Sequence, residues 1–415
     1  MNNLTSKNIM FIFFALYISL ILGFFLNEDF ALGYVMDHEV HKELLYIFDR
    51  DILSGFIDYE NKKVPHSPVY VLYINIITKI FNNDTLARFI NLHIGLLLPF
   101  FLYKSLQLKF KKNINNYLYL FPSIIFLSPY FRSGAIWIDD NLLGLVFLSI
   151  SIYYFIKYES VKKNLLVTIF FNILFLALAS YIRPIYSLFG LYFFVRYFLE
   201  IKSIKILIII ILFNLILSWP AIYYVFVLGI DGWFNSYLFR RNIVSVVYLA
   251  LSVIFFYFLP YLLFYFRNKS INFFDYKYLV LFIVSLILLN LYFSYITPYS
   301  GGIFFKSSIY LFNNLIMIYL ISSLALVCLI KFFFENKYKK NIFYDFLLLI
   351  ILLTLEVDGV IYHEAYDPLL YLLIFTIFKN NFLNNFANTM NLRKYLILLL
   401  FSSSFYVMSI MKSLI

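Results

Sequence analysis

Cysteine, charged residues, glycine and proline are all scarce in this chain, and each scarcity limits what the protein can be. Cys328 is the single cysteine in 415 residues, so neither a disulfide framework nor a cysteine metal cluster can form. Charged residues make up only 13% of the chain, too few to cover a soluble globule of this length. The 12 glycines and 10 prolines form no linker, repeat or low-complexity tract, so we predict a single domain over residues 1–415.

The residues that fill the chain instead are apolar. Hydrophobic residues make up 63% and aromatic residues 22% of the sequence, and the mean hydropathy is +0.86. This composition predicts an all-α polytopic membrane protein, because helices satisfy their own backbone hydrogen bonds in lipid. Apolar runs of roughly 17 to 25 residues mark about thirteen spans. The predicted spans are 8–26, 84–103, 115–130, 138–156, 164–181, 184–199, 205–228, 243–266, 278–296, 308–330, 342–360, 366–380 and 395–412.

Three segments at the limits of this pattern need a separate interpretation. No small-residue cleavage site follows residues 8–26, so we expect an uncleaved first helix rather than a signal peptide. Residues 366–380 are short enough to be re-entrant. Residues 69–81 are too short to span and lie between a proline and two asparagines, which predicts an amphipathic helix at the membrane interface.

The positive charges predict which side each loop faces. With a cytoplasmic N-terminus, 21 of the 33 Lys and Arg residues fall in loops on the inner side, as the positive-inside rule requires. The net charge of +11 is thereby explained without a nucleic-acid partner. Of the 22 Asp and Glu residues, 17 fall on the outer side. Because acids have little effect on insertion, this bias predicts a reaction centre on the outer face.

The longest polar segment, residues 27–68, follows the first predicted span and carries nine carboxylates. Loops of this length are usually functional. Within it the sequence MDHEVH places Asp37, Glu39 and His41 within about one turn, as a carboxylate base with hydrogen-bonding neighbours needs. A solvated acidic loop is the alternative interpretation.

Two further features lie where predicted spans meet the outer face. Asp139 and Asp140 are adjacent carboxylates at the mouth of a span. Neighbouring helix positions point about 100° apart, so at most one of them can face Asp37; a water-facing cap is the alternative. Arg183 precedes Pro184 at a helix break. A guanidinium there suits bidentate phosphate recognition, or else it only extends to the interface.

A polar stretch between two late spans adds more acids and a histidine. Its members are Glu356, Asp358, His363, Glu364 and Asp367. The spacing of His363 and Asp367 can ligate a metal, but the stretch has one histidine, so we assign no metal ligands and leave a divalent cation open.

Three cations break the positive-inside pattern because they lie on the predicted outer side. They are Arg240, Arg241 and Lys306. Each is a candidate for binding an anionic head group, and ordinary surface charge is the alternative.

Several short motifs together resemble the GT-C superfamily of membrane glycosyltransferases. A first helix and a long acidic outer loop are followed by PHSPVYVLYINIITKIFNNDTLARFINLH, SPYFRSGAIWIDDN and ASYIRPIYS, an order similar to the landmarks of that fold. The motifs are most similar to the dolichol-pathway α-1,2-glucosyltransferase family at Met36–His41, Arg88–Asn91, Arg183–Pro184 and Glu364–Asp367. The arginine of the family's late EPRY motif is missing, and its GDxxxH segment is reduced to Gly229–Asp231. Aminoarabinose-transferase-like and mannosyltransferase-like members therefore stay open.

The resemblance implies an inverting transfer of a monosaccharide from a polyprenyl-phosphate donor to a lipid-linked or cell-envelope acceptor. A carboxylate would take the proton of the acceptor hydroxyl, and the apolar body would hold the polyprenyl tail. Asp37 is the preferred base, and Glu39, Asp139 and Asp140 are the other candidates. Cations would stabilise the departing phosphate; the candidates are Arg183, Arg240, Arg241, Lys306 and His363. The resemblance implies substrate contacts for His41, Arg88 and Glu364.

Two other functions stay open at this point. A lipid-linked sugar flippase or transporter would place ionisable groups near the bilayer midplane or use matched broken helices, and a membrane scaffold would need no site. We expect membrane lipids as partners and no nucleic acid. The richness in Asn, Lys, Ile, Phe and Tyr is typical of an AT-rich genome, so we expect a bacterial inner membrane with the site facing the periplasm.

Overall fold

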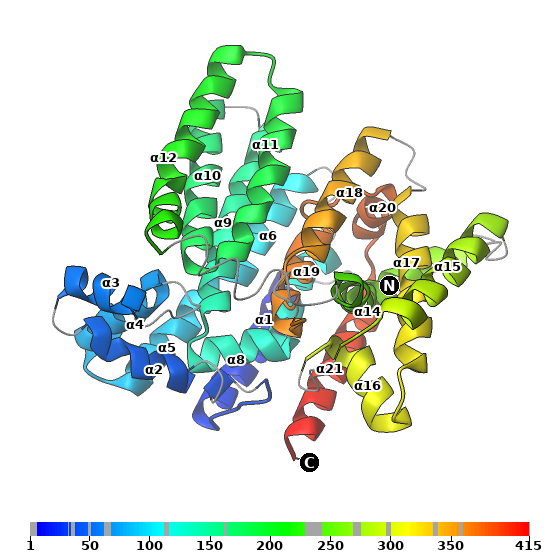
Figure 1. Ribbon diagram of the computed structural model, residues 1–415, viewed down its shortest axis with the longest axis horizontal. Coiled ribbons are helices and arrows are strands. Elements are labelled where there is room, and N and C mark those ends of the chain that lie inside the picture. The colour runs from blue at the N-terminus through cyan, green and yellow to red at the C-terminus, as the bar shows by residue number, and fades with distance from the viewer. Residues whose placement is uncertain are drawn as a thin grey trace. The chain divides into compact units, whose positions relative to one another are not determined.

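The computed structural model describes residues 6–31, 33–34, 38–48, 51–61, 68–111, 116–161, 164–228, 243–268, 275–295, 300–334, 339–356 and 360–414. Over these residues every regular element is a helix, and there is no strand (Figure 1). Contacts divide the chain into two compact units. The first unit comprises residues 1–229 and 388–415, and the second unit comprises residues 230–387. One domain over residues 1–415 stays a prediction.

Eight helical segments in the described part of the chain are long and apolar enough to cross a membrane, which confirms a helical membrane protein. At a rise of about 1.5 Å per residue, a helix needs about 20 residues to cross the hydrocarbon core. The eight segments are Lys7–Phe25, Asp84–Lys109, Asp140–Val161, Leu165–Ile182, Ile204–Tyr223, Ile243–Arg267, Ile316–Phe334 and Leu392–Met411. Each corresponds to a predicted span, and the count of thirteen stays a prediction.

The other predicted spans fold as shorter or interrupted helices. A helix of 13 residues rises only about 20 Å, and two of these runs contain a proline at the start of a 3-10 helix, a short element that is frequent at helix ends. These elements are α7 (Asn116–Leu120) with η3 (Phe121–Leu127), η4 (Pro184–Ser187) with α11 (Leu188–Glu200), α15 (Tyr276–Tyr292), α18 (Lys339–Leu353) and α19 (Leu369–Ile374). Apolar composition alone therefore does not distinguish a full span from two short helices joined at a break.

The polar segment after the first helix folds into short helices that lead to the second span. They are α2 (Glu39–Leu45), η2 (Tyr46–Phe48), α3 (Ile52–Asn61) and α4 (Pro68–Phe81), which lie together in Figure 1. The helix predicted over 69–81 is confirmed as α4. The carboxylate of Asp51 accepts the backbone N–H of Leu53 at 2.7 Å and so caps the start of α3. The segment is therefore ordered by local hydrogen bonds as well as by packing.

The other helices of the first unit carry the ends at which several predicted site residues lie. They are α1 (Ser6–Phe25), α5 (Asp84–Gly95), α6 (Leu97–Lys109), α8 (Pro129–Trp137), α9 (Asp140–Val161), α10 (Leu165–Ile182), α12 (Ile204–Leu228) and α21 (Leu392–Leu414). Helices α9, α10, α11 and α12 run side by side (Figure 1). Asn172 of α10 donates to Ser151 of α9 and accepts from Tyr197 of α11 at 2.8 Å. Such hydrogen bonds between apolar helices help hold them together in a membrane.

The second unit is built on an aromatic core. Its remaining helices are α14 (Ile243–Asn268), α16 (Gly302–Phe312), α17 (Ile316–Phe334) and α20 (Asn381–Asn388). Phe258 of α14 makes edge-to-face contacts with Phe332 and Phe333 of α17 and with Phe378. Edge-to-face pairs of this kind add to the area that aromatic rings bury.

Candidate active site in the first unit

A buried arginine fixes the start of the polar segment 27–68, which we predict to be the outer segment, to three helices. Arg132 of α8 donates from Nε and one Nη to the two carboxylate oxygens of Glu28, at 2.6 and 2.5 Å. It also donates to the hydroxyl and carbonyl of Ser19 in α1 and to the carbonyl of Phe126. Tyr406 of α21 donates to Glu28 at 3.2 Å. All five N–H groups of the guanidinium are therefore used, and the buried charge pair is fully hydrogen-bonded.

Arg88, for which the resemblance implied a substrate contact, supports the same segment. Its Nε donates to the carbonyl of Ile136 at 2.8 Å, and one Nη donates to the side chain of Asn27 at 3.3 Å. The guanidinium carbon lies 3.7 Å from the ring centroid of Trp137, a cation–π contact. Trp137 in turn donates its indole N–H to the carbonyl of Glu28 at 2.7 Å. These contacts give Arg88 a structural role, and its contact with substrate stays a prediction.

Tyr34 and His38 lie beside Trp137, and each contacts a carboxylate. The imidazole of His38 lies 5.8 Å from Trp137 and 6.2 Å from Tyr34 between ring centroids. His38 Nε2 is 3.4 Å from a carboxylate oxygen of Asp84, at the start of α5. The carboxylate of Glu39 accepts a hydrogen bond from Tyr34. This hydrogen bond and the negative charge of Glu39 both raise the pKa of Tyr34. His38 is buried, whereas Glu39 is exposed.

The predicted loop residues are described only in part. Asp37 lies outside the described residues. Glu39 begins α2, and His41 lies within α2, although its side chain is outside the described part. Among the preferred loop residues, Glu39 is therefore the carboxylate whose surroundings the structure describes.

The two adjacent carboxylates at the start of α9 serve different partners. Asp139 accepts the backbone N–H of Asn141 at 3.0 Å, which is a capping bond for α9. Asp140 lies 3.3 Å from an Nη of Arg183, which follows α10. The side chains of Asp140 and Arg183 are 10% and 15% exposed. The structure thus brings together Asp140 and Arg183, which the sequence placed 43 residues apart.

This pairing changes what each residue can do. Both carboxylates are buried, so a role as general base would require the acceptor hydroxyl to reach an enclosed group. One Nη of Arg183 donates to the carboxylate of Asp140 at 3.3 Å. An anion that approached Arg183 would compete with Asp140 for the N–H groups of the guanidinium.

The second unit holds the late candidates around the start of α16. His363 Nε2 accepts the backbone N–H of Ile303 at 2.9 Å, so the ring proton is on Nδ1, 3.3 Å from the hydroxyl of Tyr257. Burial, together with the nearby positive charge of Lys306, lowers the pKa of His363 to about 3. His363 is therefore neutral near pH 7, and the cationic role predicted for it does not fit its surroundings.

The remaining candidates of the second unit lie in two helices or outside the described residues. Glu364 follows His363 in η5 (His363–Ala365) and is partly exposed, and Lys306 lies in α16. Arg240, Arg241 and Asp358 lie outside the described residues. Within the described ranges no group of three or more His, Cys, Asp or Glu residues could hold a metal ion.

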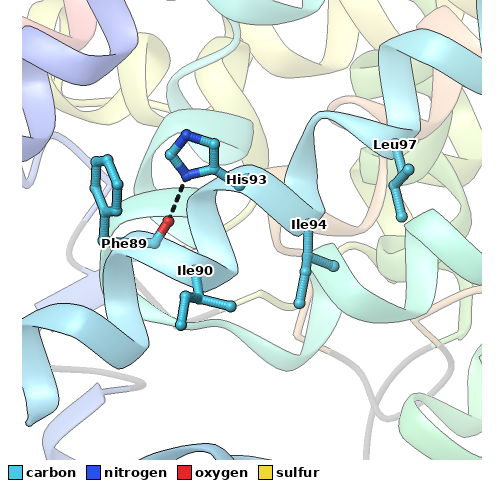
Figure 2. Close-up of a pocket in the computed structure, with 5 residues that line it drawn as sticks. All are labelled: Phe89, Ile90, His93, Ile94 and Leu97. Carbon is cyan, nitrogen blue, oxygen red and sulfur yellow. Dashed lines mark hydrogen bonds between the residues drawn. The ribbon is translucent and has the colours of Figure 1, made fainter. Parts of the chain in front are cut away.

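A shallow apolar groove runs along the N-terminal half of the segment Asp84–Lys109, in the first unit. It has a volume of about 400 Å³ and is lined by Phe89, Ile90, His93, Ile94 and Leu97 (Figure 2). His93 Nδ1 lies 2.7 Å from the carbonyl of Phe89, so this nitrogen donates and Nε2 accepts from the hydroxyl of Tyr17 at 2.8 Å. The polar atoms of the imidazole are thereby engaged, and the surface that remains suits a hydrocarbon chain.

The sequence interpretation missed His38, Asp84 and the pair of Glu28 with Arg132. A signal for Asp84 was present in DTLARF, where Asp84 and Arg88 are four residues apart and so share one face of a helix. No pattern predicted that Glu28 and Arg132, 104 residues apart, would meet. Asp29 was also passed over, and burial raises its pKa above the usual value.

Fold and site together define a multi-pass helical membrane protein whose first unit gathers acids and arginines at one end of its helices. Comparison with known proteins gives no matching family model, no similar curated protein and no matching solved structure.

Proposed function

We propose that this chain is an inverting glycosyltransferase of the GT-C type, which moves a monosaccharide from a polyprenyl-phosphate donor to a lipid-linked or cell-envelope acceptor. One observation carries most of the support. Residues from four separate segments, Glu39, Asp84, Asp140 and Arg183, lie at the end of the first unit where α5 and α9 begin and α10 ends. This end corresponds to the predicted outer face, where the sequence concentrates its acids.

The chemistry of such a transfer matches the groups at this end. A sugar hydroxyl is a weak nucleophile, so a carboxylate must accept its proton as the new glycosidic bond forms. Asp37 is our preferred base on the motif, and the exposed carboxylate of Glu39 is the described alternative. The donor phosphate leaves as a monoester and needs cations rather than a general acid.

The cation assigned to the phosphate in the first unit is Arg183. The phosphate oxygens would displace Asp140 and take the guanidinium fork in bidentate fashion. In the second unit Lys306 stays a candidate for binding an anionic group, and we assign no step to His363.

The lipid environment completes the proposal. The groove formed by Phe89, Ile90, Ile94 and Leu97 beside His93 would take part of the polyprenyl tail, because its lining is apolar. Helices α2 to α4 would lie at the outer membrane interface, and we place the chain in a bacterial inner membrane with this end toward the periplasm. The partners would be the polyprenyl-phosphate sugar, the glycan acceptor and membrane lipids.

The test uses the full chain in lipid nanodiscs with polyprenyl-phosphate glucose, mannose or aminoarabinose and a lipid extract as the acceptor pool. We expect acceptor-dependent release of polyprenyl phosphate with one of the three donors. Asp37→Asn should lower turnover by about 10²- to 10⁴-fold, with Glu39→Gln tested in parallel. Asp58→Asn is the matched control, because Asp58 is an exposed carboxylate of the same outer segment.

The alternatives give different results in this experiment and in a parallel one with the chain in sealed lipid vesicles. Loss of turnover in Glu39→Gln with turnover retained in Asp37→Asn would transfer the role of base to Glu39. A donor that crosses the membrane of a vesicle intact would indicate a flippase. Absence of polyprenyl phosphate release with every donor would reject the proposal for these sugars.

A further inference from the structure

His38 is enclosed although it belongs to the most polar segment of the chain. Its side chain is 7% exposed, with the rings of Tyr34 and Trp137 beside it. The carboxylate that faces it, Asp84, is 40% exposed. The side chain of a histidine in a solvated loop would be exposed to water on more than one side. Here it meets aromatic rings and one carboxylate.

Asp84 is not needed to begin its own helix. The side chain of Asn83 already accepts the backbone N–H of Leu86 at 3.1 Å and so caps α5. The Asp84 carboxylate lies instead at 3.4 Å from His38 Nε2. Lys42 and Arg88 are the other charged groups that act on it. The hydrogen bond thus joins the outer segment to the second span rather than two neighbours within one helix.

The second span is itself fixed on this side. Arg88 lies one turn beyond Asp84, and its contacts with Trp137 and the carbonyl of Ile136 tie α5 to α8. Asn91, almost one turn further, donates to the carbonyl of Gly134 at 3.1 Å. The helix that carries Asp84 is therefore held firmly in place. His38 is the residue of the outer segment that contacts Asp84.

We propose that His38 and Asp84 are a positioning pair that holds residues 38–48, with the exposed carboxylate of Glu39, against the start of α5. The function of the pair rests on the proposed glycosyl transfer. It keeps the acidic end of the outer segment at a fixed place relative to Asp140 and Arg183, so that a carboxylate meets the acceptor hydroxyl. Neither member of the pair takes the proton itself.

The first arm of the test measures hydrogen exchange of backbone amides in the full chain in nanodiscs. Asp84→Ala should speed exchange in residues 38–48 about tenfold or more, because the imidazole loses its carboxylate partner. Exchange in α9 and α10 should stay unchanged, which shows that the first unit is folded. Asp84→Glu should restore part of the protection, and Asp58→Asn, an exposed control, should change nothing.

The second arm measures turnover with the polyprenyl-phosphate sugar that the native chain uses. For a positioning pair, Asp84→Ala lowers kcat by about tenfold or more while KM for the donor changes less than threefold, and Asp84→Glu recovers part of kcat. A pair that only stabilises the fold would lower the amount of folded protein and leave kcat per folded molecule unchanged.

The two arms separate this proposal from the proposed function. Unchanged exchange in Asp84→Ala overturns the pair, whatever the activity. Faster exchange with unchanged kcat overturns its role in the reaction. A native chain that transfers none of the three sugars removes the proposed function for those donors, and the exchange arm still decides whether His38 and Asp84 hold the outer segment.

Discussion

The charge pair of Arg132 and Glu28 gives the sharpest prediction about stability. Their side chains are 2% and 7% exposed, so neither charge has access to bulk water. Arg132→Met removes the cation and leaves the Glu28 carboxylate buried, with the Tyr406 hydroxyl still donating to it. Removing one partner of a buried pair costs about 3–5 kcal/mol, because the remaining charge is left uncompensated.

Removing both charges should be less harmful than removing one. In the double variant Arg132→Met, Glu28→Gln, the amide oxygen at position 28 can still accept from Tyr406 and no ion remains. We therefore expect the second substitution to recover about 0.5–3 kcal/mol, the range in which contacting residues couple. Arg393→Met is the matched control, because Arg393 is exposed on α21 and should matter by less than about 0.5 kcal/mol.

The assay is thermal unfolding of the purified chain in one detergent. For a folded unit of this size about 1 kcal/mol corresponds to 2–4 °C in Tm, so Arg132→Met should lower Tm by about 6–20 °C. The double variant should melt above the single variant. If the double variant melts at or below Arg132→Met, the two charges do not depend on each other and the reasoning from burial is refuted.

The remaining predictions concern topology, the phosphate site and acid stability. An alkaline-phosphatase fusion after Asp58 should be active and one after Lys111 inactive, because most Lys and Arg residues sort to one side; the reverse result contradicts our orientation. Arg183→Lys should lower turnover about tenfold or more with Tm little changed, since a point charge does not replace a bidentate fork; full activity would make Arg183 an interfacial anchor. The folded pKa of His363, about 3, lies below its ordinary 6.5, so only the unfolded chain takes up this proton between those values. Stability should therefore fall on acidification from pH 6.5 toward 3, by up to about 1.4 kcal/mol per pH unit, and less steeply in His363→Gln. Equal slopes of Tm against pH in both proteins would show that His363 does not cause the loss.

The sequence predicted some features of the fold well. Long apolar runs identified all eight spanning segments of the described chain, because a run of that length must be buried in lipid. Residues 69–81 were expected to be helical, and α4 confirms this. Hydropathy did not predict the short 3-10 turns at η3 and η4, which interrupt two of the predicted spans.

The sequence predicted which residues belong to the candidate site better than it predicted what each of them does. Asp139, Asp140 and Arg183 were chosen because boundary charges are costly, and all three are buried or partly buried at one helix end. Their roles followed only from the structure. Asp139 caps α9, Asp140 pairs with Arg183, and Arg88 packs on Trp137.

The sequence by itself determined that this chain is a helical membrane protein, because composition and run length are local properties that each segment carries alone. The tertiary structure decided which charges are paired. Glu28 meets Arg132 across 104 positions and His38 meets Asp84 across the outer segment, and neither contact leaves a periodic trace in the chain. A buried charge must find a partner wherever the fold brings one within reach, and that partner depends on how the helices pack rather than on spacing along the sequence.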